Sequence, residues 1–218
     1  MASTMNPSPV HRSSCLRCGT CCRKGGPALH LEDRDLVLQG LIHTRHLYTI
    51  RKGEFAKDPV RGELIRVDGD IIKIKGREGS WVCRFLDEDA NACRIYEHRP
   101  IECRQLECWD TARLEQVYRH GRLSRKDLLT DVQGLWELIE DHERRCDYDR
   151  IRRVPGGRPG TGAAEIDGSP AEITRYDAEL RRLMVARGGL EPEMLDFLLG
   201  RPVETVLRLN LSDSYPGF

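Results

Sequence analysis

The chain has 218 residues, of which 39% are hydrophobic and 32% charged, enough for one substantial domain with an ordinary core. Its 35 basic and 35 acidic residues give a formal net charge of zero, so the overall charge does not indicate nucleic acid or an anionic membrane as a partner. The first 14 residues are polar and no segment approaches 18 consecutive apolar residues, which predicts a cytoplasmic protein without a membrane partner.

Nine cysteines are more than a buried core requires. The number is odd, so complete pairing into disulfides within the chain would leave one thiol over. In a reducing compartment, cysteine-rich patterns indicate metal or redox chemistry more often than disulfides. The cysteines are therefore expected to bind a metal.

The first distinctive segment is the run Cys15-x-x-Cys18-x-x-Cys21-Cys22. CxxC spacing lets one tight turn present two thiolates to a metal or cluster, and Gly19 supplies the sharp backbone that such a turn needs. Successive side chains diverge, so Cys21 and Cys22 fit one tetrahedral ion poorly. Two interpretations stay open: the site is polynuclear, or one of the pair is a ligand and the other is redox-active or structural.

Two elements are expected after this run. Residues 32–42 place leucines among charges, which predicts a short amphipathic helix. Residues 63–75 alternate around Asp68-Gly69, a dipeptide that favours a type I′ hairpin turn. A hairpin with this turn would place Ile65 opposite Ile72.

The next segment contains three widely spaced cysteines. Residues 81–86 are few and aromatic-rich, which predicts a further strand. Cys83, Cys93 and Cys103 lie at intervals of ten, too far apart for one turn. The tertiary fold must therefore bring them to the N-terminal run, closing loops of roughly 60 residues or more, so that metal binding would contribute to the free energy of folding.

The chain after Pro100 is predicted to be helical, with apolar residues three and four apart over 114–118. Ser124 is an expected helix cap, and the apolar stripe after it would continue along one helix to His142 and Cys146 on the core side. The stripe consists of Leu128, Leu129, Val132, Leu135, Trp136 and Ile139.

A glycine- and proline-rich segment follows. Residues 155–170 read PGGRPGTGAAEIDGSP, in which half of the residues are Gly or Pro, too many for a helix or strand. We expect a linker between a cysteine-cluster metal-binding domain over 1–154 and a C-terminal tail over 171–218. Within the tail, the expected elements are helices over 171–186 and 193–199 and an edge strand over 205–211.

Three motifs occur together: CxxCxxCC at 15–22, CRFL at 83–86 and CRIYEHRPIECR at 93–104. This combination resembles the YkgJ-type cysteine-cluster family, a zinc- or iron-chelating CxxCxxCC domain. A related cysteine cluster occurs in flagellin lysine methylases, so the resemblance implies an iron-sulfur cluster. The predicted metal ligands are Cys15, Cys18, Cys21, Cys22, Cys83, Cys93 and Cys103.

Two cysteines lie outside this pattern. In an ideal helix Cys103 and Cys108 would sit about 140° apart, so Cys108 joins the site only if the helix ends or distorts between them. Cys146 is either a further ligand, with His142 one turn earlier as a possible partner, or a small buried hydrophobe. Arg99 and Arg104 are expected to offset the charge of the thiolates.

The remaining histidines are expected to be exposed or to cap helices, with an alternative for His98, which could donate a hydrogen bond to a cluster sulfur. They are His30, His43, His46, His98 and His120. The sequence has no P-loop, GxGxxG following a strand, GxSxG or HExxH motif, so no catalytic residue is assigned.

These observations predict an α+β fold: a small metal-binding domain with a β-hairpin and several helices, plus a mostly helical tail. The leading hypothesis is an iron-sulfur protein in electron transfer, or a redox accessory to an enzyme, with a protein redox partner. The alternatives are a structural module that binds zinc ions, a metal-delivery or sensing protein for zinc or iron, and, more weakly, a methyltransferase-like enzyme.

Overall fold

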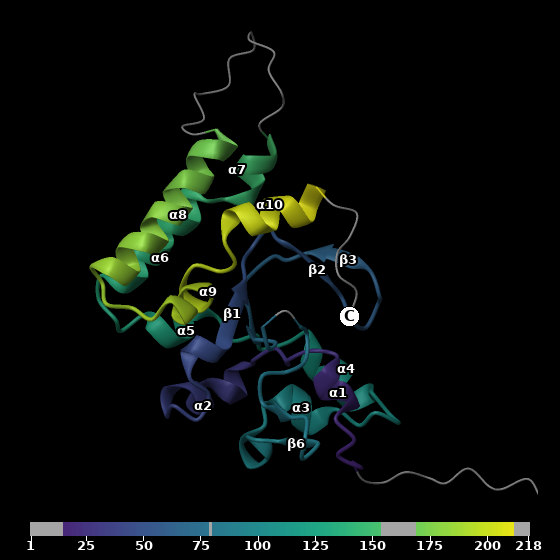
Figure 1. Ribbon diagram of the computed structural model, residues 1–218. Coiled ribbons are helices and arrows are strands. Elements are labelled where there is room, and N and C mark those ends of the chain that lie inside the picture. The colour runs from purple at the N-terminus through teal and green to yellow at the C-terminus, as the bar shows by residue number, and fades with distance from the viewer. Residues whose placement is uncertain (1–14, 79, 154–168, 212–218) are drawn as a thin grey trace, which may run out of the picture.

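The computed structural model describes residues 15–78, 80–153 and 169–211 (Figure 1). Short two-stranded antiparallel sheets are surrounded by helices, which confirms the α+β class. The expected linker over 155–170 lies outside the described residues except for its last two, and the division of the chain at that segment stays a prediction. No helix in the described ranges has the length and apolar character needed to cross a membrane.

The central sheet pairs β1 (Leu47–Ile50) with β4 (Ile71–Ile74) in antiparallel register. Ile72 and Ile74 are almost completely buried. The backbone N–H of Leu29 donates to the carbonyl of Ile72 at 2.8 Å, so the segment after the cysteine run lies along the other edge of β4. This contact joins the N-terminal run to the core.

The prediction of one hairpin over 63–75 is wrong, although both of its strands exist. β3 (Leu64–Arg66) pairs with β2 (Phe55–Lys57), whereas β4 pairs with β1, so Ile65 and Ile72 lie in different sheets. Ile65 is only half-buried, and Ile72 has no exposed surface. The long-range pairing of β4 with β1 is more stable than a local hairpin, because it places the apolar side of β4 in the main core.

The predicted strand over 81–86 is wrong for most of its length. Strand structure starts only at β5 (Leu86–Asp87), which pairs with β6 (Ala92–Cys93). The backbone N–H of Leu86 donates to the carbonyl of Cys83 at 2.9 Å, which closes a turn where an extended strand was expected. Cys83 lies in that turn.

Five short helices belong to the first part of the chain: α1 (Thr20–Arg23), α2 (Arg34–Leu38), α3 (Ile101–Gln105), α4 (Ala112–Tyr118) and α5 (Arg125–Leu129). The helices expected within 32–42, after Pro100 and at 114–118 are therefore confirmed. Ser124 accepts a hydrogen bond from the backbone N–H of Asp127, which confirms the predicted cap.

The single helix expected from Ser124 to Cys146 is instead two helices. After α5 the chain turns, and α6 (Leu135–Arg145) begins behind Gly134, whose φ of 80° is in the left-handed region that glycine tolerates best. Val132 lies in the turn and is exposed, not in the apolar stripe. His142 and Cys146 are fully buried, which confirms the predicted core side of α6.

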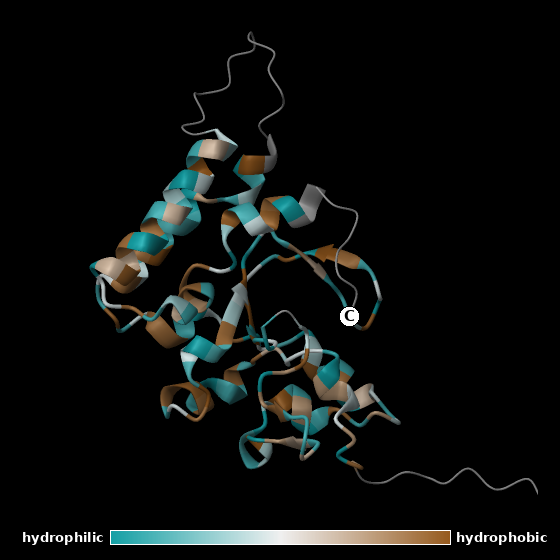
Figure 2. Ribbon diagram, viewed as in Figure 1, coloured by the Kyte–Doolittle hydropathy of each residue, from teal (hydrophilic) through white to brown (hydrophobic). Residues whose placement is uncertain are grey.

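The C-terminal part contains α7 (Tyr148–Arg153), α8 (Pro170–Ala186), α9 (Leu195–Leu198) and α10 (Val203–Leu211). The predicted helices at 171–186 and 193–199 are confirmed, and Figure 2 shows alternating hydrophobic and hydrophilic bands along α8. The predicted edge strand at 205–211 is wrong. Val203 and Val206 are both buried, and this spacing of three fits a helix with one buried face.

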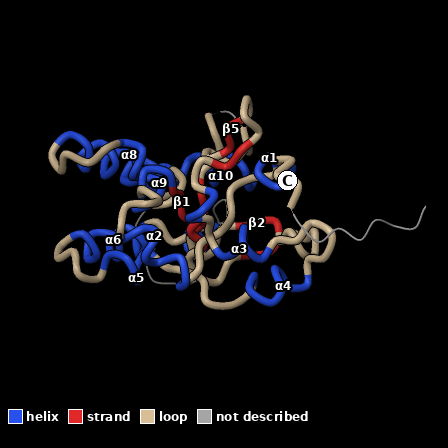
Figure 3. The backbone as a smooth tube through the Cα atoms, turned by 90° about the horizontal axis from the view of Figure 1, so that it is seen from below, coloured by secondary structure: helices blue, strands red, loops and turns tan. Residues whose placement is uncertain are grey.

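Helix α9 packs against β1, as seen from below in Figure 3. The hydroxyl of Thr49 donates to the carbonyl of Phe197 at 2.7 Å, and Phe197 is fully buried in the same core as Ile72. The C-terminal helices therefore complete the core around the central sheet.

A buried arginine links the sheet to these helices. Arg125 is 2% exposed and donates to both carboxylate oxygens of Asp70 at 2.8 and 2.9 Å, to Glu143 at 2.8 Å and to the carbonyl of Leu198 at 2.8 Å. Burial alone would lower the pKa of Arg125, but the bonds to Asp70 and Glu143 hold it above its ordinary value. Arg125 thus fixes the start of β4 against α6 and α9.

Replacing Arg125 with Met should lower the free energy of unfolding by about 3–5 kcal/mol, because it removes the donor to the partly buried Asp70 carboxylate and to the Leu198 carbonyl. Urea unfolding followed by circular dichroism measures this loss. Lys126→Met, an exposed neighbour in the same helix, is the matched control and should change stability by less than about 0.5 kcal/mol. A similar small effect of both substitutions would contradict this role of Arg125.

Candidate metal centre

The N-terminal run enters α1 through a sharp turn at Gly19, whose φ is 71°. A Cβ atom there would lie 2.6 Å from Nη1 of Arg23 and from Oδ1 of Asn91, so the position requires glycine, as the spacing predicted. Cys21 and Cys22 lie in α1 with their Sγ atoms 4.0 Å apart.

A backbone hydrogen bond joins this run to the second group of cysteines. The N–H of Cys83 donates to the carbonyl of Cys22 at 2.7 Å. Leu86 directly follows the turn that carries Cys83, and Cys93 lies opposite Leu86 in the β5–β6 pair. Cys103 lies in the middle of α3.

Coulombic interactions link the thiols of Cys21, Cys22, Cys83, Cys93 and Cys103, which we call the five-cysteine cluster, and Cys18 interacts with Cys21 at its edge. The Cys21 thiolate and burial raise the pKa of Cys22, with Cys83 and Cys103 adding to the effect. Burial and the neighbouring sulfurs also raise the pKa of Cys83 and Cys103. A bound cation would remove this repulsion and replace the thiol protons.

Cys21 has the opposite behaviour. The hydrogen bond from Cys22 is the largest influence and lowers the pKa of Cys21 to about 6, with Arg99 adding a small favourable charge. The hydrogen bond between the adjacent thiols therefore favours a thiolate at Cys21. A thiolate is the form that ligates metals.

The other predicted ligands are Cys15, Cys18, Cys108 and Cys146, and they differ in exposure and in position. Cys15 and Cys18 are exposed in the loop before α1, and Cys18 is electrostatically coupled to Cys21. Cys108 is exposed in the segment between α3 and α4. Cys146 is buried with residues of α7, α8 and α10, in a part of the molecule away from α1, α3 and β6 (Figure 1). The structure does not bring Cys146 to the five-cysteine cluster.

Asn91 holds the N-terminal loop against the β5–β6 turn. Its Oδ1 accepts from Arg23 Nη2 at 3.1 Å, and its Nδ2 donates to the carbonyl of Arg17 at 3.2 Å. Arg23 also donates to the carbonyl of Cys18 at 2.9 Å. Sequence reasoning missed Asn91 and Arg23, because a polar residue in a turn gives no signal of a partner some 70 residues away.

Tyr96 provides a second attachment for this loop. The guanidinium carbons of Arg17 and Arg99 lie 4.1 and 3.6 Å from the centre of its ring. The Arg17 contact attaches the loop and is worth about 0.5–1 kcal/mol at an exposed site, whereas the Arg99 contact lies within the segment of Tyr96 itself. Arg104, which was expected to offset thiolate charge, lies 4.0 Å from Asp33 in an ion pair and donates to the carbonyl of Arg99.

His30 is fully buried and is the N-cap residue of the 3-10 helix Leu31–Asp33, so the capping alternative is confirmed and the exposed one is wrong. Its Nδ1 lies 2.7 Å from the carbonyl of His120, and its Nε2 lies 3.1 Å from Glu102 Oε1. Burial alone would raise the pKa of Glu102, but bonds from His30, Arg122 and the N–H of Ala28 hold it below its ordinary value. This network fixes α3, which carries Cys103, to the segment after the N-terminal run.

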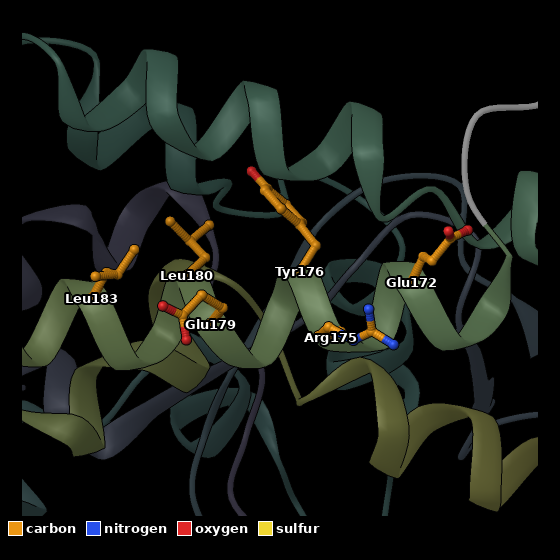
Figure 4. A pocket seen from close by; sticks show the side chains of 6 residues that line it. All are labelled: Glu172, Arg175, Tyr176, Glu179, Leu180 and Leu183. Carbon is orange, nitrogen blue, oxygen red and sulfur yellow. The ribbon is translucent and has the colours of Figure 1, made fainter.

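A hollow on the surface of α8 offers no metal site. Figure 4 shows its lining, and Tyr176 points from α8 toward α6, where its hydroxyl donates to Asp141 at 3.0 Å. The lining residues are Glu172, Arg175, Tyr176, Glu179, Leu180 and Leu183. None of them is a cysteine or histidine, so the five-cysteine cluster is the stronger candidate site.

In metal-free, reduced protein, alkylation of Cys21 by iodoacetamide should rise with a midpoint near pH 6, because its thiolate forms there. The rate should fall below that pH as the thiolate gains a proton. Mass spectrometry after timed quenching identifies the modified residue. Cys22→Ala should move the midpoint up toward about 8.5, the ordinary range, since it removes the donor to Cys21.

Cys108→Ser is the control for the Cys22 substitution, because it removes an exposed thiol from another segment and should leave the Cys21 profile unchanged. A midpoint near 8.5 in the unsubstituted protein would show that Cys22 does not stabilise the thiolate.

The cysteine spacing and this geometry agree with one comparison to known proteins. The family model CxxCxxCC, described as "Putative zinc- or iron-chelating domain", matches residues 14–127, more than half of the chain. No curated protein and no solved structure matches the chain. The matched range includes the whole five-cysteine cluster and ends before α6. The chain belongs to the CxxCxxCC family of zinc- or iron-chelating domains and is a metal-binding protein.

Proposed function

We propose that the five-cysteine cluster, with Cys15 and Cys18 at its edge, binds an iron-sulfur cluster, and that the protein acts in electron transfer or as a redox accessory to an enzyme. The observation that carries this proposal is the backbone bond between Cys83 and Cys22, which joins the two groups of cysteines. The site offers sulfur donors from several segments, the ligand type that iron-sulfur clusters require. When bound, such a cluster supplies one-electron chemistry.

The spread of the sulfurs favours a polynuclear centre over one zinc ion. Tetrahedral zinc with bonds of about 2.3 Å holds its sulfurs about 3.8 Å apart. Cys21 and Cys22 have a suitable distance of 4.0 Å, but among the described cysteines no three sulfurs all lie within 4.8 Å of one another. Ligands spread in this way can serve different metals of one cluster.

The surroundings of the cluster also suit a redox role. Arg99 places a positive charge near Cys21, which offsets part of the charge that several thiolates create. Cys15, Cys18 and Cys21 are exposed, so one side of the centre is open to a protein redox partner.

Purification without oxygen, followed by iron, sulfide and zinc analysis, tests the proposal. Iron and inorganic sulfide should be present in comparable amounts, with at least two of each per chain. Cys83→Ser should lose most of both, because it removes the thiolate of the second group that lies next to the N-terminal run. Stoichiometric zinc at the cysteines without inorganic sulfide would contradict the iron-sulfur proposal and favour the structural zinc module.

Arg113→Ser is a control for purification losses, since Arg113 is an exposed residue of α4 paired only with Glu107 at 3.7 Å among the contacts of its side chain described here. It should retain the iron and sulfide of the unsubstituted protein. Equal loss in Arg113→Ser and Cys83→Ser would show that handling, and not the missing thiolate, removes the metal.

A further inference from the structure

A second group of metal-binding side chains lies outside the range of the family match. An imidazole nitrogen of His142, Sγ of Cys146 and a carboxylate oxygen of Asp177 all lie within 4.8 Å of one another. His142 and Cys146 have no exposed surface, and Asp177 is 2% exposed. Among the residues that the structure describes, no other set of three His, Cys, Asp or Glu side chains has its donor atoms this close together.

The helices explain how the three side chains meet. His142 lies in the last turn of α6, and Cys146 is the C-cap residue that follows. Residues four apart on a helix share one face, so both point to the same side. Asp177 lies in the middle of α8 and faces them across the space between the two helices.

Asp177 is an acceptor at every contact. Its oxygens accept from Nε2 of His142 at 2.8 Å, from Nε of Arg181 at 3.0 and 3.1 Å, and from the N–H of Val203 at 3.0 Å. Burial alone would raise the pKa of Asp177, but these donors hold it below its ordinary value. The carboxylate is therefore ionised and supplies one negative charge.

The imidazole has bonding capacity that the protein does not use. Nδ1 of His142 is buried and has no hydrogen-bond partner, although an unpaired buried polar atom destabilises the folded state. Tyr176 stacks against the ring, with 6.4 Å between the ring centres, and covers it from one side. The His142 ring thus carries one nitrogen bound to Asp177 and one that is free to take a ligand, in a group that also holds a thiol and a carboxylate.

We propose that His142, Cys146 and Asp177 form a second, buried site for a divalent zinc ion. Imidazole, thiolate and carboxylate are the three donor types that zinc takes in proteins, at about 2.0–2.3 Å. Binding would form a zinc–sulfur bond and release the Cys146 proton to solvent, with no change of oxidation state. The two anionic donors would neutralise the ion.

The charges around the site permit this exchange. Arg51 lies near Cys146, donating to its backbone carbonyl at 2.6 Å, but it is also paired with Glu143 at 2.9 Å. Arg181 is paired with Asp177 and donates to the carbonyl of Gly200 at 2.8 Å, so it keeps a partner if the ion takes one carboxylate oxygen. The site would join α6 to α8 and so act as a structural clamp.

The first test counts zinc in the full chain. Metal-depleted protein is incubated with zinc alone, passed through gel filtration and analysed by mass spectrometry for zinc per chain. Cys146→Ser and His142→Gln should each bind one zinc ion fewer than the unsubstituted protein. Tyr176→Phe is the matched control, because it keeps the ring beside His142 and all three donors, and it should keep the full zinc count. Equal counts in all four proteins would overturn the proposal.

A second test needs no substitution and therefore does not depend on how the variants fold. One equivalent of zinc is added to protein whose iron-sulfur or other native centre is intact, and the zinc environment is measured by X-ray absorption. One sulfur at about 2.3 Å with nitrogen and oxygen at about 2.0–2.2 Å is expected. A shell of sulfur alone would place the zinc at the five-cysteine cluster. That result would overturn the site at His142, Cys146 and Asp177, but it would not decide which metal the five-cysteine cluster binds in the native protein.

Discussion

The backbone hydrogen bond from Cys83 to the carbonyl of Cys22 is the contact on which the candidate metal centre depends. It joins the short helix α1 to the turn before β5, two segments that sequence separates by about 60 residues. Two further contacts support this arrangement. Asn91 binds the loop before α1, and the pair of His30 and Glu102 fixes α3, so that the cysteines of α1, of the β5–β6 region and of α3 face one another.

Gathering thiols in a partly buried place has an electrostatic cost. Burial and, to a smaller extent, neighbouring sulfurs raise the pKa values of Cys83 and Cys103, whereas hydrogen bonds lower those of Cys18 and Cys21. A metal cation reverses this balance, since it attracts every thiolate at once. Metal binding and folding of the α1, β5–β6 and α3 region should therefore be coupled, whereas the core around β1, β4 and α9 has its own apolar contacts.

The sequence predicted the family and the approach of Cys22 and Cys83 better than the strand pairing. Cysteine spacing and Gly19 report local chemistry, so the CxxCxxCC family and the approach of distant cysteines could be predicted from residue types alone. The pairing of β4 with β1, in place of a hairpin at Asp68-Gly69, could not be predicted. It depends on the binding of Asp70 by Arg125 and on the burial of Ile72 in the core, which no local pattern contains. The break at Gly134 was missed because a glycine can also lie inside a continuous helix. Helix α10 was missed because its short apolar segment is also compatible with an edge strand.

We propose that the N-terminal run and the cysteines at 83–103 form one metal centre. A double-mutant cycle in metal content and affinity tests it most directly, with Cys21→Ser, Cys93→Ser and the double variant compared under anaerobic conditions. One shared centre predicts strong non-additivity: either substitution removes most of the metal, and the second adds little. Independent losses that add, or full metal retention in Cys93→Ser, would contradict a shared centre.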